Sequence, residues 1–131
     1  MSSYQNALGL DLGAARIGVA RINAIARIAE PLVVLANDAH FDDRLEQLLA
    51  EHAIDLIVVG LPRNLSGETT QQSDSVIAFC KQHLDHLSIP YVYQDETLST
   101  HTAKTMLSKK HGVGMEDALA ACVILEDFAT L

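Results

Sequence analysis

The chain has 131 residues, of which 49% are hydrophobic, and a formal net charge of −8. This length suffices for one domain with a hydrophobic core but not for two, so a single domain over residues 1–131 is expected. The negative charge disfavours broad binding to nucleic acid, so any contact with phosphate must be local. No run reaches the ~20 apolar residues of a membrane span and no signal peptide is recognisable, so a cytoplasmic protein without membrane contact is expected. Cys80 and Cys122 lie in apolar helical patterns and are predicted to be reduced core residues.

Residues 7–20 are the first hydrophobic stretch, and one carboxylate, Asp11, stands inside it. Residues 13–15 are small and supply a tight bend, and the apolar pattern resumes at residues 17–20, so a β-hairpin is predicted. Burying an unpaired charge in a strand is costly, so Asp11 either bonds to the amides of the turn or faces a cation in a cleft. The second possibility makes Asp11 a candidate for metal or phosphate chemistry.

The next segments complete the first part of a sheet. Residues 31–36 are apolar and predict a third strand that pairs with the second in an antiparallel meander. A helix is expected over residues 39–53, with acidic side chains on its outer face. Residues 55–60 are apolar without alternation, which is typical of a central strand covered on both faces. The loop at residues 61–68 follows the carboxyl end of that strand, where open α/β sheets place their sites.

The following segments alternate helix and strand. A helix is expected over residues 70–86, where apolar positions recur at helical spacing. A strand is expected over residues 89–94. Two acids, Asp95 and Glu96, then stand at the carboxyl end of this strand. They form a second candidate position for chemistry on the same sheet.

Two further helices are predicted near the end of the sequence. The first begins near Ser99 or Thr100 and is broken by the Lys- and Gly-containing segment at residues 109–114. The second runs over residues 115–128 and carries Asp117 in its first turn. The neighbours of Asp117 three, four and seven positions later are small or apolar, so this acid is expected on the face turned to the sheet.

Three acids on separate elements, Asp11, Glu96 and Asp117, are thus predicted to meet at one site. No basic residue inside the core is expected to neutralise them, so a divalent cation with oxygen ligands would relieve their repulsion. Magnesium typically takes one or two carboxylates together with water and substrate phosphate. Such a site would hydrolyse a phosphodiester with a metal-activated water.

Four groups of residues, in this order along the chain, resemble the YqgF family, also called RuvX. They are residues 9–13 with 16–20, residues 59–62 with Asn64 and Gly67, Asp95 and Glu96 with residues 98–100 and Ala103, and Asp117 with Ala120, Ala121, Ile124 and Leu125. The match spans almost the whole chain. The resemblance implies a ribonuclease H-like α/β fold, in which helices lie on both faces of a mixed five-stranded sheet. That sheet combines an antiparallel three-strand meander with parallel strands.

The resemblance also implies a metal-dependent nuclease, with Mg²⁺ or Mn²⁺ as the expected cofactor. The family is associated with processing the 5′ end of precursor 16S rRNA and is related to Holliday-junction resolvases. Asp11, Glu96 and Asp117 match the acidic triad of the family, so they are expected to be catalytic and to hold the metal. Contacts to substrate are expected from four other residues: Arg16, Arg63, Asn64 and Lys104.

Other interpretations remain open at this point. One is a junction resolvase acting on branched DNA, and another is a non-catalytic protein that binds RNA or the transcription machinery. A phosphate-binding lobe of the actin and sugar-kinase type would also suit the hairpin, but such ATPases need two lobes. A resolvase calls for a two-fold dimer. The predicted helices carry excess acid on their outer faces, which would repel a second copy, so a monomer or weak homodimer is expected.

Overall fold

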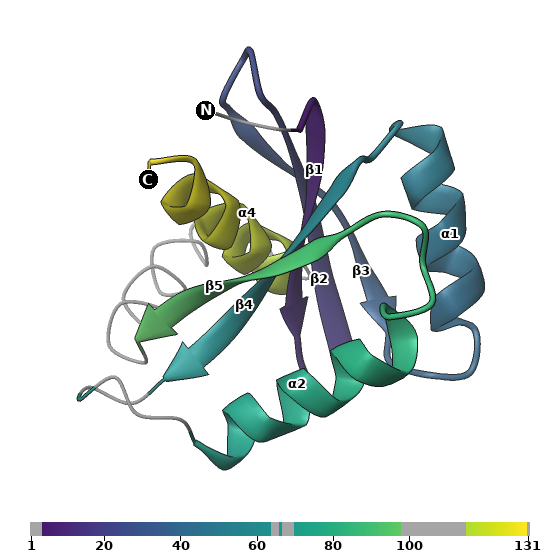
Figure 1. Cartoon of the computed structure of the whole chain (residues 1–131), viewed down its shortest axis with the longest axis vertical. Helices are drawn as coiled ribbons and strands as arrows, with labels where there is room; N and C mark the ends of the chain where they lie inside the picture. The colour runs from purple at the N-terminus through teal and green to yellow at the C-terminus, as the bar shows by residue number, and fades with distance from the viewer. Residues whose placement is uncertain (1–3, 64–65, 67–69, 98–114, 131) are drawn as a thin grey trace.

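The computed structural model describes residues 4–63, 66, 70–97 and 115–130. They form a five-stranded sheet in the order β3-β2-β1-β4-β5 (Figure 1). The strands are β1 (Asn6–Leu12), β2 (Arg16–Asn23), β3 (Ala29–Ala36), β4 (Leu56–Arg63) and β5 (Tyr91–Thr97). The helices are α1 (Phe41–Glu51), α2 (Gln71–His83) and α4 (Glu116–Ala129).

The sheet is mixed, as predicted. Strand β1 is antiparallel to β2, and β2 is antiparallel to β3, which gives the expected meander. Strand β4 is parallel to β1, and β5 is parallel to β4. The carboxyl ends of β1, β4 and β5 therefore point the same way, and they define the edge of the sheet where a site is expected.

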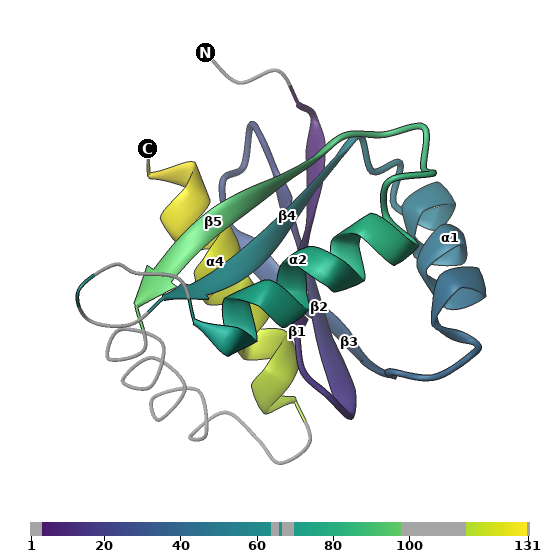
Figure 2. The same cartoon turned by 60° about the horizontal axis from the view of Figure 1, so that its bottom comes forward.

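Helices cover both faces of the sheet, which is also as predicted (Figure 2). On one face Leu8 and Leu10 belong to a core that includes Phe41 and Leu45 of α1 and Val76 of α2. On the other face a second core joins β1, β2 and β4 to α4 through the side chains of Ala7, Ala20, Ile22, Leu56, Val58, Ala121, Cys122, Ile124 and Leu125. Alternate residues of each strand thus enter different cores, because successive side chains point to opposite faces.

Several strands are longer than the sequence predicted, and strands β4 and β5 extend further at their carboxyl ends. The parallel ladder of β4 and β5 continues past the apolar runs through three further pairs, the last of which joins Arg63 to Thr97. Arg63 therefore belongs to a strand and not to the following loop, and Glu96 lies within β5 and not after it. The prediction ended each strand too early because polar residues interrupt the apolar pattern at these positions. The strands continue because backbone hydrogen bonds between them do not depend on side-chain polarity.

The helix boundaries differ from the expected ones by a few residues. Helix α1 begins and ends two residues inside the predicted range, and α2 ends at His83. The helix expected after Ser99 falls outside the described residues. Cys80 and Cys122 are buried and free, as predicted. No helix within the described ranges is long and apolar enough to cross a membrane.

Candidate active site

Asp11 and Glu96 project from the same face of the sheet, the one that α4 covers. Ala7 of β1 and Val58 of β4 belong to the core on the α4 side, so residues two and four positions further along these strands share that side. This places Asp11 of β1 on the α4 face. Glu96 is in register with Pro62 of β4, and it takes the same face. Two of the three predicted acids therefore come together by strand register alone.

The two carboxylates line one small cavity of about 40 Å³, which has room for a few water-sized groups. Glu96 has an exposed fraction of only 6%. The other residues around this space are Leu12, Gly60, Pro62, Gln72 and Ile124. Among the described residues that line the cavity there is no Lys or Arg.

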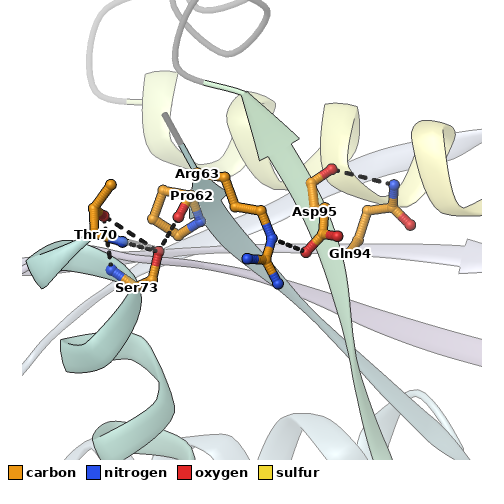
Figure 3. A network of polar contacts seen from close by, with 6 residues as sticks. All are labelled: Pro62, Arg63, Thr70, Ser73, Gln94 and Asp95. Carbon is orange, nitrogen blue, oxygen red and sulfur yellow. Dashed lines mark hydrogen bonds and ion pairs between the residues drawn. The ribbon is translucent and has the colours of Figure 1, made fainter. Parts of the chain in front are cut away.

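The first turn of α2 closes one side of this cavity and brings Gln72 to it. Thr70 and Ser73 form a reciprocal capping box, with Ser73 N donating to Thr70 Oγ1 at 3.1 Å. The hydroxyl of Ser73, which is fully buried, also donates to the carbonyl oxygen of Pro62 (Figure 3). These bonds fasten α2 to the end of β4. Neither Gln72 nor Ser73 was among the predicted site residues, although Thr70 followed three positions later by a hydroxyl residue is a helix-start signal.

Asp117 approaches the same face through a glycine in β2. Gly18 is the register partner of Asp11, and a Cβ atom added to it would lie 1.8 Å from the carbonyl oxygen of Asp117. Only glycine therefore allows the first turn of α4 to rest on the strand beside Asp11. Asp117 is half-buried there, in agreement with the prediction that it lies on the face turned to the sheet.

The Asp117 carboxylate does not line the cavity of Asp11 and Glu96. Its Oδ2 accepts a hydrogen bond from Arg16 Nε at 2.9 Å. The described residues accordingly hold no group of three or more acid, His or Cys side chains that could bind a metal ion. The structure thus brings Asp11 and Glu96 together and holds Asp117 close by, in an ion pair with a residue expected to contact substrate.

Arg63 lies on the opposite face of the sheet from Glu96. Its Nε donates to Asp95 Oδ1 at 2.8 Å, and this pair spans the ends of β4 and β5 (Figure 3). Because neighbouring strand residues alternate in direction, Arg63 and Asp95 point away from the α4 side, to which Pro62 and Glu96 point. The two remaining residues predicted to contact substrate, Asn64 and Lys104, lie outside the described residues.

The comparison with known families decides where the chain belongs. Residues 5–130 match the model of the RuvX family, which is described as Holliday junction resolvase. The chain belongs to the RuvX family. Two relatives bear the name "Putative pre-16S rRNA nuclease". The one from Synechocystis is 33% identical, with 100% of this chain and 91% of the relative covered. The one from Cereibacter sphaeroides is 37% identical, with 91% and 79% covered.

Solved structures share the fold of this RuvX member. The Thermus thermophilus RuvC in complex with a Holliday junction matches with a TM-score of 0.57 and 12% identity, over 96% of this chain and 95% of that one. The fowlpox virus resolvase in complex with junction DNA matches with a TM-score of 0.59 and 8% identity, over 95% and 97%. These likenesses confirm the predicted ribonuclease H-like fold. Membership of RuvX makes the chain a nuclease that hydrolyses phosphodiesters.

The donor set of this RuvX site fits a hard divalent cation. Two carboxylates in one cavity, with a third on the adjacent helix turn, are ligands that Mg²⁺ and Mn²⁺ accept. No cysteine is among the described residues that line the cavity. Burial raises the pKa of Cys80 to about 11 and that of Cys122 to about 12. Both thiols therefore stay protonated at neutral pH.

Proposed function

We propose that the chain is a metal-dependent endonuclease of the cytoplasm that processes the 5′ end of precursor 16S rRNA. The observation that carries this proposal is the cavity shared by Asp11 and Glu96, in a chain that aligns over most of its length with relatives named for that substrate. Paired carboxylates on rigid strands are suited to phosphodiester hydrolysis, because they need no rearrangement of the backbone.

Asp11, Glu96 and Asp117 are the residues that would hold Mg²⁺ or Mn²⁺. When bound, the metal supplies an activated water and neutralises charge on the phosphate. The chain itself orients the substrate. Gln72 presents an amide at the cavity, and an amide N–H can donate to a phosphate oxygen. Contacts to the backbone phosphates of the substrate are proposed for four residues: Arg16, Arg63, Asn64 and Lys104.

The test is incubation of the purified protein with precursor 16S RNA, with unstructured single strands and with four-way DNA junctions. Each substrate is tested with Mg²⁺, with Mn²⁺ and with a chelator. Single cuts near the 5′ end of the precursor, only with metal, are expected. No cleavage of any substrate, together with retained RNA binding, would favour the non-catalytic alternative.

A junction resolvase is the second candidate, because the RuvX description and the solved relatives name that activity for their own proteins. Paired, symmetric cuts require two active sites in a two-fold dimer, typically with more than ~1,000 Å² buried. Exposed acids on α1 (Asp43 and Glu46) and on α4 (Glu126) disfavour such an interface. We therefore expect a monomer or weak dimer in light scattering. A stable dimer that nicks a junction symmetrically would contradict the proposal of an RNA substrate and support branched DNA as the substrate.

A further inference from the structure

One proposed metal ligand, Asp117, forms an ion pair with Arg16. The Nε–Oδ2 distance is 2.9 Å, and the pair joins the start of β2 to the first turn of α4. Asp11 and Glu96 line the cavity without Asp117. A carboxylate that bonds to a guanidinium through this oxygen does not offer the same oxygen to a cation.

The main chain of Asp117 packs directly against β2. Its carbonyl oxygen rests on Gly18, where the strand leaves no space for even a methyl group. Gly18 is in register with Asp11, and antiparallel partners have Cα atoms about 4.5 to 5.5 Å apart. The main chain of Asp117 thus lies against the strand neighbour of Asp11.

The Arg16 side chain is open to a competing anion. It is 71% exposed, compared with 33% for the Asp117 side chain. Exposed ion pairs contribute little to stability, so exchange of the partner costs little. A guanidinium binds phosphate with the same planar, forked geometry that it uses for a carboxylate.

We propose that Arg16 is a positioning residue that couples substrate binding to metal binding through Asp117. Without substrate, Arg16 holds the Asp117 carboxylate. When nucleic acid binds, one of its backbone phosphates replaces the Asp117 carboxylate as the partner of Arg16. The Asp117 carboxylate is then released to join Asp11 and Glu96. This inference rests on the proposed function, and it adds that metal and Arg16 compete for one carboxylate. Because coupling is reciprocal, metal binding also frees Arg16 for phosphate.

The competition is tested by calorimetric titration of the full chain with Mn²⁺ in the absence of nucleic acid. Arg16→Ala is expected to bind Mn²⁺ about three- to five-fold more tightly than wild type, as the loss of a weak competing pair implies. Arg16→Lys, which keeps the charge, is expected to restore most of the wild-type affinity. The matched control is Arg21→Ala, which removes an arginine from the same strand that is paired with Glu30. It should leave the affinity unchanged.

A double-mutant cycle separates release of Asp117 from a general change of charge. In an Asp117→Asn background, removal of Arg16 should no longer change the Mn²⁺ affinity, because the contested carboxylate is gone. A second readout is the NMR signal of Arg16 Nε–Hε, which is expected to move to the position of a free arginine when Mg²⁺ saturates the protein.

Equal Mn²⁺ affinity of wild type and Arg16→Ala would overturn the coupling and leave the proposed nuclease intact. An Arg16→Ala effect that persists in the Asp117→Asn background would also overturn it. Absence of metal binding to the wild-type protein would overturn both the coupling and the metal-dependent function. Tighter binding in Arg16→Ala, in a protein that cleaves no RNA, would support the coupling and contradict only the substrate.

Discussion

Gly18 of β2 lies directly against the main chain of Asp117, so the position of a proposed metal ligand depends on the absence of a side chain one strand away. No rotamer change relieves a clash with a backbone carbonyl. The first turn of α4 would have to move if residue 18 carried a Cβ atom.

Gly18→Ala is therefore expected to destabilise the protein by about 1 to 3 kcal/mol, as overpacking typically does, and to abolish cleavage. Urea unfolding measures the first effect. A Gly18→Ala protein that is as active and stable as the wild type would show that α4 is not fixed by this contact.

Asp11→Asn is expected to remove cleavage while the fold survives. Asp11 and Glu96 line one cavity, and two carboxylates a few ångströms apart repel each other by a few kcal/mol at an effective dielectric constant near ~20. The metal-free variant should therefore melt no lower than the wild type. Asp43→Asn, which neutralises an exposed acid of α1, serves as the control and should cleave normally. Normal cleavage by Asp11→Asn would remove Asp11 from the site.

Millimolar Mg²⁺ or Mn²⁺ is expected to raise the melting temperature. A ligand that binds only the folded state adds about 2.7 kcal/mol at one hundred times its Kd. Glu96→Gln should lose most of this increase, whereas Glu46→Gln, an exposed change on α1, should keep it. Thermal melts in metal and in chelator provide the measurement. Identical melting of the wild type under both conditions would contradict a metal site.

Ser73→Ala is expected to lower the free energy of unfolding by about 1 to 3 kcal/mol, because it removes the half of the capping box in which Ser73 Oγ accepts from Thr70 N, and it leaves the Pro62 carbonyl without its buried donor. Ser75→Ala is a close control. Its hydroxyl is exposed and, among the described residues, bonds to Gln71 within the same helix, so the expected change is within about 0.5 kcal/mol. Similar losses for both variants would show that the bond to β4 contributes nothing.

Much of the fold could be predicted from the sequence, because the spacing of apolar residues within a segment indicates whether it forms a strand or a helix. The order of elements, the antiparallel meander and the face of α4 that carries Asp117 follow from such patterns. The strand ends could not be read in this way, since Arg63 and Glu96 interrupt the apolar runs. The pairing of Arg16 with Asp117 was also beyond reach. It joins residues 101 positions apart and arises only when α4 docks on β2.

The two cysteines give a prediction about pH. Burial raises the pKa of Cys80 to about 11 and that of Cys122 to about 12. The thiols of the unfolded chain lose their protons near pH ~8.5, whereas those of the folded chain keep them. The contribution of the two thiols to the free energy of unfolding is therefore fully present below that pH and should decline as the pH rises towards 11. At pH 8 the native protein should react with a thiol reagent far more slowly than the denatured protein. Rapid labelling of both thiols in the native state would contradict their burial.

Side chains of β5 point alternately to the two faces of the sheet, so two adjacent acids of this strand have different partners. Asp95 pairs with Arg63 on one side of the sheet, and Glu96 enters the cavity on the other. The function of these two acids therefore depends on the number of residues that precede them in β5, as well as on their residue types. Deletion of a single residue from that segment would exchange the two carboxylates between the faces, which would leave the arginine facing the wrong acid and the cavity with the shorter side chain. Relatives that tolerate length changes here should confine them to the connection before the strand.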